Sequence, residues 1–333
     1  MREKIAVIGS NSFSGASFIA YCLPLGTEML GISRSFEPAE VFLPYYKWNG
    51  LSRSSSFRFE RLDINHDTDK IVEVIRKFHP DYIINFAAQG MVAQSWDHPE
   101  HWYQTNLIGN VKLHDQVRHF NFLKKYVHIS TPEVYGSCSG KVTESIPFNP
   151  STPYAASKAA CDLHLLTFFK NYGFPVVFTR AANVYGPGQQ LYRIIPRTIL
   201  YIRLGKKIQL HGGGVSVRCF IHIQDVSSAT LRIARNGIIG QTYHIATDKN
   251  ISIKELVELI CKMMNVGFEE AVEIAPERPG KDAAYLLDSA KLRKELYWTD
   301  CISLEDGIHQ TINWVDNNLE ELKKQPAEYV HKE

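Results

Sequence analysis

The stretch that decides the fold is Ile5-Ala6-Val7-Ile8-Gly9-Ser10-Asn11-Ser12-Phe13-Ser14-Gly15. Its apolar start predicts a buried strand, its middle predicts a turn, and a helix-like stretch follows over residues 13–23. Glycine at 9 permits a tight turn, and glycine at 15 lets the helix pack closely on the strand. Such a turn aims backbone N–H groups and a helix N-terminus at a phosphate. Ser12 replaces the usual middle glycine, and its hydroxyl is a candidate donor to a pyrophosphate. An ordinary strand–helix turn is the alternative reading of this stretch alone.

Short β-branched runs alternate with helix-like stretches through the first half of the chain. The expected strands are residues 5–8, 29–32, 57–62, 82–86, 126–129 and 176–179, and the expected helices are 13–23, 67–78, 99–120 and 154–172. This alternation of apolar strands and helices predicts an α/β fold with a Rossmann-type, doubly wound parallel sheet.

After residue 187 the alternation loosens. Further helices are expected over 191–204, 223–235, 252–264 and 303–317, the third of them opened by a capping box of Ser252 and Glu255. We therefore expect residues 1–187 to form a dinucleotide-binding domain and residues 188–330 to form mainly a smaller C-terminal substrate-binding lobe. Segments around 215–248 are expected to return to the first domain.

Composition excludes several classes of protein. Of the 333 residues, 44% are hydrophobic, and 37 Lys and Arg against 35 Asp and Glu leave no basic field for nucleic acid. No stretch approaches the ~20 apolar residues of a membrane span, so we expect no membrane partner. Six scattered cysteines without a C-x-x-C pair indicate a reducing, cytoplasmic compartment. The histidines lack H-E-x-x-H spacing, so we expect no metal. The last dozen residues are polar, and we expect them to be frayed.

The end of the second expected strand indicates which dinucleotide binds. NAD sites usually place an acid there to bind the ribose hydroxyls. This chain has Ser33, Arg34 and Ser35 at that position. A guanidinium and two hydroxyls suit a 2′-phosphate, so the residues favour NADP over NAD. The alternative is that Arg34 is an ordinary solvated surface residue.

Tyr154 and Lys158 lie one helical turn apart and share a helix face. A tyrosine with a pKa of ~10 is a poor base at neutral pH, but a nearby ammonium favours the phenolate. Such a pair can take a proton from an alcohol while hydride leaves for a nicotinamide. Tyr-x-x-x-Lys also occurs often by chance. Its context here is Ser130-Thr131-Pro132-Glu133, a hydroxyl pair and a carboxylate after an expected strand, where open α/β sheets bind ligands.

With these motifs the chain resembles the extended short-chain dehydrogenases/reductases, specifically nucleotide-sugar 4,6-dehydratases of the dTDP-glucose and GDP-mannose type. Nearly the whole chain carries the resemblance. The motifs on which the resemblance rests are the glycine turn, Asn85-Phe86-Ala87-Ala88-Gln89, Thr105-Asn106, Ser130 to Gly136, Pro153 to Lys158, Arg180 to Pro187, Arg218 to His222 and Arg278 to Asp282.

The resemblance implies a redox-neutral dehydration of a nucleotide-diphosphate sugar. Tyr154, paired with Lys158 and aided by Thr131, removes the 4-hydroxyl proton while hydride passes from C4 to the dinucleotide. Glu133 matches the family's base at C5. The C6 hydroxyl then leaves as water and the hydride returns to C6, which gives a 4-keto-6-deoxy sugar.

The resemblance also implies binding residues and a dimer. The cofactor residues are Gly9, Ser12, Phe13, Ser14, Gly15, Ser33, Arg34, Ser35, Asp63, Ile64, Ala87, Ala88, Gln89, Asn106, Tyr154, Lys158 and Ala181. The substrate residues are Met91, Ser95, Asn183, Arg193, Gln209, His211, Arg218 and Arg278. Family members usually form homodimers through a four-helix bundle, to which residues 99–120 and 154–172 would contribute.

Pro132 departs from the dTDP-glucose type, which has an aspartate there to protonate the departing hydroxyl. Glu133 could serve as both base and acid, because it holds a proton once it has removed one. Two alternatives stay open. One is another nucleotide-sugar enzyme on this scaffold, such as a 4-epimerase, a decarboxylase or a different eliminase; the other is a non-catalytic NADP-binding regulator.

Overall fold

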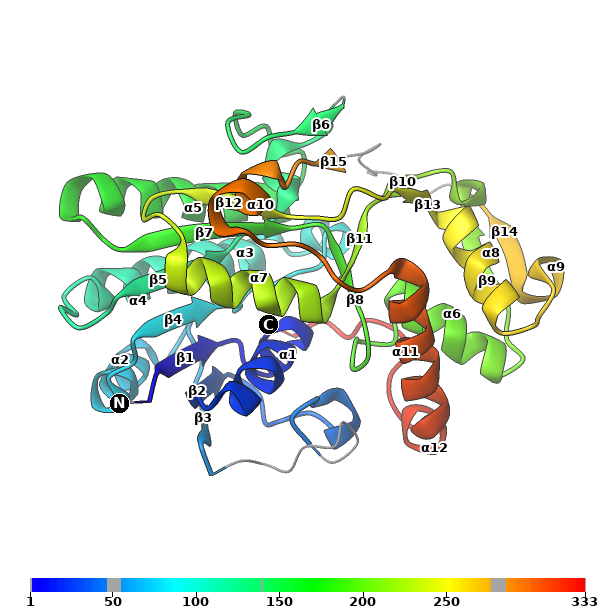
Figure 1. The fold of residues 1–333 in the computed structure, drawn as a ribbon, viewed down its shortest axis with the longest axis horizontal. Helices are drawn as coiled ribbons and strands as arrows, with labels where there is room; N and C mark the ends of the chain where they lie inside the picture. Colours follow the sequence, from blue (N-terminus) through cyan, green and yellow to red (C-terminus); the bar gives the residue numbers. More distant parts are fainter. Residues whose placement is uncertain (1, 47–54, 139, 277–285, 333) are drawn as a thin grey trace.

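The computed structural model describes residues 2–46, 55–138, 140–276 and 286–332. Its centre is a seven-stranded sheet whose neighbouring strands are all parallel, which confirms the predicted doubly wound fold (Figure 1). From edge to edge the strands are β12 (Thr242–Ile245), β7 (Val176–Ala181), β5 (Lys125–Ile129), β4 (Tyr82–Asn85), β1 (Lys4–Ile8), β2 (Glu28–Ser33) and β3 (Phe57–Arg61). The strand order reverses between β1 and β4, and ligands bind at such a switch point.

Helices cover both faces of the sheet. One face carries α1 (Phe13–Cys22) and α7 (Ile223–Asn236), which contact each other, and the other carries α2 (Thr68–Phe78), α4 (Asn110–Val117) and α5 (Pro153–Tyr172). Apart from the edge strand β3, the strands are largely buried on both sides, which explains why they read as almost continuous apolar runs. None of the described helices combines the length and the apolar character needed to cross a bilayer.

The helix expected over 99–120 is divided into three parts. It contains α3 (Pro99–Tyr103), a π-helical segment over 104–109 and then α4. The side-chain amide of Asn110 donates from Nδ2 to the backbone carbonyl of Thr105 at 2.9 Å and stabilises this wider turn. Irregular turns of this kind are frequent at functional sites, and this one carries Thr105 and Asn106.

The smaller lobe lies at one end of the sheet (Figure 1). It contains α6 (Ile194–Arg203), β9 (Ile208–His211), β10 (Val217–Arg218), β13 (Ile251–Ser252), α8 (Ile253–Met263), α9 (Phe268–Ala271), β14 (Val272–Ala275), α11 (Leu304–Asn317) and α12 (Leu319–Leu322). The predicted capping box of Ser252 and Glu255 opens α8. The remaining elements are β8 (Asn183–Tyr185) paired with β11 (Phe220–His222), β6 (Lys141–Val142) paired with β15 (Leu286–Leu287), and α10 (Ala290–Leu296).

The expectation that the last dozen residues are frayed is wrong for residues 325–332. In Figure 1 this segment leaves α12 and runs back to the middle of the molecule, where Lys332 lines one cavity together with Asn11 and Phe13 at the start of α1. The carbonyl of Lys332 accepts hydrogen bonds from Arg34 and Gln89 there.

Candidate active site

The glycine turn has the geometry that its sequence predicts. Gly9 adopts a φ of 81°, and a Cβ at this position would lie 2.6 Å from the amide nitrogen of Ala87. A Cβ at Gly15 would lie 2.3 Å from the carbonyl oxygen of Gly9, so only glycine lets α1 start this close to the turn. The Ser12 hydroxyl donates to the Gly9 carbonyl at 2.7 Å and accepts from the Gly15 amide at 3.1 Å. Ser12 therefore caps α1, and its hydroxyl proton is engaged within the turn.

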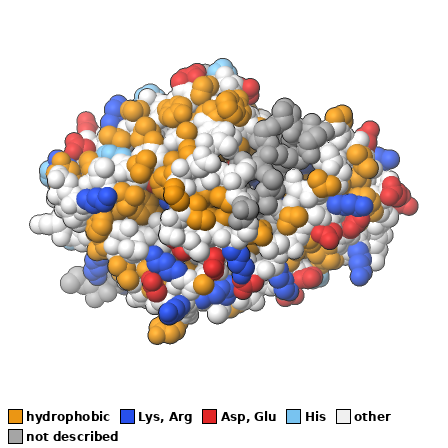
Figure 2. Space-filling model, turned by 90° about the horizontal axis from the view of Figure 1, so that it is seen from above, with side chains coloured by type: hydrophobic (Ala, Val, Ile, Leu, Met, Phe, Trp, Pro, Cys, Tyr) orange, Lys and Arg blue, Asp and Glu red, His pale blue; other side chains and the backbone are white. Residues whose placement is uncertain are grey.

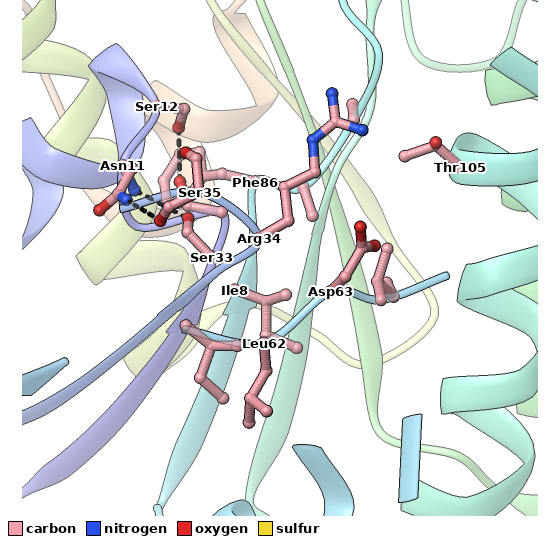
Figure 3. A pocket seen from close by; sticks show the side chains of 15 residues that line it. Ile8, Asn11, Ser12, Ser33, Arg34, Ser35, Leu62, Asp63, Phe86 and Thr105 are labelled. Atoms are coloured by element: carbon pink, nitrogen blue, oxygen red, sulfur yellow. Dashed lines mark hydrogen bonds between the residues drawn. The ribbon is translucent and has the colours of Figure 1, made fainter. Parts of the chain in front are cut away.

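A pocket of about 180 Å³ lies beside the glycine turn at the switch point (Figure 3). In Figure 3, Arg34 extends into it from the end of β2, and Asp63 stands beside Arg34 from the segment after β3. The sequence-predicted cofactor residues that line it are Gly9, Ser12, Ser33, Arg34, Ser35, Asp63, Ile64, Ala87 and Ala88.

This pocket suits an adenosine with its phosphates. Apolar side chains such as Ile32 and Leu62 offer walls for a flat base, and Arg34 and Asp63 offer polar groups for a ribose. The Ser33 hydroxyl accepts from the backbone amide of Asn11 at 3.0 Å, which ties the end of β2 to the glycine turn. The residues present therefore fit a nicotinamide dinucleotide.

A second cavity, of about 450 Å³, opens at the carboxyl end of β5. It brings together all four predicted catalytic residues, Thr131, Glu133, Tyr154 and Lys158, although they come from the loop after β5 and from α5. The other predicted residues that line this cavity are Ser12, Phe13, Ser14, Ala88, Gln89, Met91, Ala181, Asn183 and Arg193. Ser12 and Ala88 line both cavities, so the dinucleotide pocket and the catalytic cavity are neighbours.

Burial controls the protonation of the tyrosine–lysine pair. Burial raises the pKa of Tyr154 to about 12, while a hydrogen bond with Thr131 and the charge of Arg193 act in the opposite direction. Burial lowers the pKa of Lys158, whose Nζ donates to the carbonyl of Ile129 at 2.8 Å. Without added positive charge, Tyr154 is therefore a phenol at neutral pH.

A buried charged network lies behind the catalytic loop. Asp162 Oδ2 accepts from the Ser130 hydroxyl at 2.6 Å and from Arg180 Nη2 at 2.7 Å. Arg180 also donates to the hydroxyl of Tyr135, which lies 2.7 Å from His244 Nε2. Asp162 and Arg180 are both at most 2% exposed. The network fixes the residues on either side of Thr131 and Glu133, and no pattern in the sequence predicts it.

Two predicted contact residues are hydrogen-bonded behind the cavity wall. Asn106 is fully buried, and its amide accepts from the Gln89 backbone N–H at 2.8 Å and donates to the Ser157 hydroxyl at 3.0 Å. Asn106 therefore positions Gln89 instead of contacting the cofactor itself. Ser95 is also fully buried, and its hydroxyl donates to the carbonyl of Val92 at 2.6 Å. Ser95 does not line the catalytic cavity, so the structure does not place it at the sugar.

The predicted nucleotide contacts lie in the smaller lobe. Gln209 and His211 are on β9 and Arg218 is on β10, and none of these three lines the catalytic cavity. Arg218 Nη1 donates to the carbonyl of Val217 at 2.8 Å, and His211 Nδ1 lies 2.9 Å from the carbonyl of Pro276. Arg278 lies outside the described residues.

The cavity also contains residues that sequence reasoning missed. Among them are the polar side chains of Gln189, Gln190, Tyr192 and Tyr329. The first three lie within five residues after Pro187, the end of a motif already recognised, so their position was a usable signal. Tyr329 lies in a polar segment without periodicity and gave no signal.

The expected absence of a metal stays a prediction. His98, Glu100 and His101 bring three ligand atoms within 4.8 Å of one another at the start of α3. Exposed groups of this kind are common without an ion.

Comparisons with known proteins agree with this geometry. The family model described as GDP-mannose 4,6 dehydratase matches residues 7–311. A dTDP-glucose 4,6-dehydratase from Neisseria meningitidis serogroup B is 30% identical to this chain, covering 95% of this chain and 94% of that protein.

Solved structures are similar along almost the whole chain. A dTDP-glucose 4,6-dehydratase from Streptomyces venezuelae, with NAD bound, has a TM-score of 0.87 and 28% identity, covering 96% of this chain and 98% of that chain. A UDP-glucuronic acid 4-epimerase from Bacillus cereus, in complex with UDP-glucuronic acid and NAD, has a TM-score of 0.84 and 26% identity, covering 94% and 99%.

Proposed function

Because the chain belongs to the GDP-mannose 4,6 dehydratase family, we propose that it is a nucleotide-sugar 4,6-dehydratase, a lyase. Its substrate is a nucleotide-diphosphate hexose and its product is the corresponding 4-keto-6-deoxy sugar. The observation that carries the proposal is the position of Glu133 in the same cavity as Tyr154, Thr131 and Lys158. Oxidation at C4 needs only the tyrosine, its lysine and the hydroxyl, whereas water loss also needs a carboxylate to remove the C5 proton.

Proton transfers in this reaction belong to two residues. Tyr154 takes the proton of the 4-hydroxyl, with Thr131 hydrogen-bonded to the phenol. A bound nicotinamide dinucleotide supplies the acceptor of the C4 hydride and later donates it to C6. Glu133 takes the C5 proton, which the new C4 ketone has acidified. The C6 hydroxyl then departs as water with the proton that Glu133 holds, because Pro132 offers no acid. As the hydride returns to C6, C5 regains a proton, which the proton taken up by Tyr154 balances. One water leaves, and the dinucleotide and both side chains end in their starting states.

The preferred dinucleotide in our proposal is NADP, with NAD as the other candidate. Arg34 supports NADP because a planar guanidinium in the pocket suits a 2′-phosphate. NAD is supported by the structurally similar dehydratase from Streptomyces venezuelae, which has NAD bound.

A panel of nucleotide sugars tests the proposed reaction. Purified protein with dinucleotide is incubated with dTDP-, UDP-, GDP- and CDP-hexoses and with UDP-glucuronate, and the products are analysed by mass spectrometry. Loss of one water without net reduction of the dinucleotide is expected for one of the hexoses. An isomer of unchanged mass would instead identify a 4-epimerase, which the similarity to the Bacillus cereus enzyme supports, and loss of carbon dioxide would identify a decarboxylase.

Substituting the carboxylate separates oxidation from dehydration. Glu133→Gln should abolish water loss but retain C4 oxidation, so that reduced dinucleotide accumulates and absorbs in the near ultraviolet. Tyr154→Phe is the matched control, because it should abolish both steps. Normal turnover by Glu133→Gln would show that another group removes the C5 proton.

We also propose that the protein is a cytoplasmic homodimer. On α3–α4 and α5 the exposed large apolar side chains are Tyr103, Ile108, Leu163 and Tyr172, with 38–54% of their surface accessible. Figure 2 shows hydrophobic side chains gathered over the part of the upper face that lies above the large sheet. A four-helix bundle would cover the apolar side chains of these helices. Leu163→Arg should convert the dimer to a monomer in light scattering.

The proposed cytoplasmic location rests on the cysteines, because free thiols suit a reducing compartment. Four of them, Cys22, Cys161, Cys219 and Cys261, are buried free thiols.

A further inference from the structure

Residues 325–332, the returning segment, reach the rim of the dinucleotide pocket. The carbonyl of Lys332 accepts from Arg34 Nη2 at 3.1 Å and from Gln89 Nε2 at 2.5 Å. Arg34 lines the dinucleotide pocket, and Gln89 lines the catalytic cavity. One backbone carbonyl therefore joins the two halves of the site.

Aromatic packing anchors the segment just before this contact. The ring of His331 lies parallel to that of Trp102, with 5.2 Å between centroids and 3° between planes. His331 Nε2 lies 2.8 Å from His101 Nδ1, and its Nδ1 lies 3.1 Å from the hydroxyl of Tyr329. Both ring nitrogens of His331 are thus engaged, and Trp102 is fully buried beneath the ring.

The segment also forms part of the catalytic cavity. Tyr329 lines that cavity, with its ring edge-on to Tyr192 at 5.6 Å. Glu328 pairs with Arg197 of α6, which fixes the approach of the segment from the smaller lobe. These contacts hold the segment across the mouth of the site from one lobe to the other.

The returning segment encloses the dinucleotide site without filling it. Between the segment and the glycine turn is a cavity of about 420 Å³, lined by Asn11, Phe13, Arg34, Gln89 and Lys332 among others. No residue of the segment lines the dinucleotide pocket itself. The N-terminus of α1, where a pyrophosphate would bind, therefore stays accessible from inside the enclosed space.

From this arrangement we propose that the returning segment is part of the dinucleotide-binding site and closes over the bound pyrophosphate and nicotinamide ribose, so that the dinucleotide is retained through each turnover. The inference rests on the proposed function, since a reaction that returns its own hydride gains from a dinucleotide that does not leave between the two transfers. An oxidoreductase that exchanges its dinucleotide in every cycle has no such need.

Release of the dinucleotide measures this role directly. The full-length protein is loaded with the fluorescent reduced dinucleotide, NADPH or NADH. An excess of the non-fluorescent oxidised dinucleotide, NADP or NAD, is then added, and loss of the fluorescence of the bound reduced nicotinamide is followed without any sugar. His331→Ala removes both the ring stack and the hydrogen bonds, and should accelerate release about tenfold, a factor that corresponds to about 1.4 kcal/mol. Tyr329→Phe removes only the hydroxyl contact and should accelerate it about threefold.

The matched control is His309→Ala, since His309 is an exposed histidine on α11 whose Nδ1 contacts only Asn313 among the hydrogen bonds of the described residues. It should leave the release rate unchanged. Thermal unfolding without dinucleotide identifies any variant that simply fails to fold, and Tyr329→Phe then carries the test. Release from His331→Ala and Tyr329→Phe at the unaltered rate would overturn the proposal, and slower release or tighter binding would show that the segment obstructs the site.

Failure of this inference differs from failure of the proposed function. A protein that removes water from a nucleotide sugar but releases its dinucleotide equally fast in all variants contradicts only the closing role. A protein whose His331→Ala variant loses its dinucleotide quickly, but which converts no sugar, contradicts only the dehydratase.

Discussion

Asp162→Asn should destabilise the protein far more than the loss of any surface ion pair. The substitution keeps the shape of the side chain but removes the charge that neutralises Arg180, 2.7 Å away and only 2% exposed. Breaking a buried pair by removing one partner costs about 3–5 kcal/mol, because the remaining charge stays buried without compensation. The hydrogen bond from the Ser130 hydroxyl to Asp162 would also weaken. A loss of this size is a large part of the ~5–15 kcal/mol that stabilises a typical domain.

The assay is equilibrium unfolding in urea, with the wild-type protein and a matched variant as references. Asp316→Asn breaks a bidentate pair with Arg203, at 2.6 and 2.8 Å, but both side chains are about one-third exposed. Its free energy of unfolding should fall by about 1 kcal/mol or less. Asp162→Leu combined with Arg180→Met should recover much of the loss, because neither charge of the pair is then left buried without its partner. Equal losses for Asp162→Asn and Asp316→Asn would refute the reasoning.

Three further outcomes follow from the geometry. Arg34→Ala should weaken NADP binding by about tenfold or more and NAD binding much less, measured by titration of both dinucleotides; equal losses would remove the basis for NADP. Gly9→Ala should cost about 1–3 kcal/mol of stability and impair dinucleotide binding, whereas Gly26→Ala, with the same φ of 81° but open space around it, should cost less and leave binding intact. Burial lowers the pKa of His128 to about 4, so the unfolded chain takes up this proton near pH 6.5 and the folded chain does not. The contribution of His128 to stability is therefore fully present above pH 6.5 and is lost as the pH falls toward 4, roughly 2 kcal/mol by pH 5. Other buried histidines, among them His222 and His244, have lowered pKa values as well, so the urea midpoint of His128→Gln should still fall with pH but less than that of the wild type, and an equal fall in both proteins would contradict the prediction.

Local features of the chain were sufficient to predict the sheet and the centre of the site. The roles of Gly9 and Gly15 were predictable because a tight turn, and a helix that packs closely on that turn, require glycine at fixed positions of a short motif. Tyr154 and Lys158 share a helix face because they are four residues apart. The π-helical segment was not predictable, because its hydrogen bonds depend on Asn110 packing in a particular register.

Contacts between distant parts of the chain left no such pattern. Lys332 contacts Gln89 across 243 positions, and Arg180 contacts Tyr135 across 45. The local sequence around each of these residues is ordinary, since Lys332 lies in a polar segment, Arg180 in a strand and Tyr135 in a loop. Only the folded sheet brings the ends of β5 and β7 together, so the buried network and the returning segment could not be read from periodicity or spacing.

The raised pKa of Tyr154 implies an order of events. A phenol with a pKa of about 12 holds its proton at neutral pH almost completely, so sugar that enters before the dinucleotide meets no effective base. From the chain, the charge of Arg193 lowers the pKa of Tyr154, while the charge of Glu133 raises it and burial has the largest effect. Additional positive charge must therefore arrive with the oxidised dinucleotide, and it disappears when hydride is accepted. Tyr154 then becomes a weaker acid again and keeps the proton it has taken. The positive charge of the oxidised dinucleotide thus favours proton removal from the 4-hydroxyl, and its loss on reduction favours retention of that proton on Tyr154 until the hydride returns. If the returning segment holds the dinucleotide in place, as we propose, the hydride transfers from C4 and to C6 take place in one turnover.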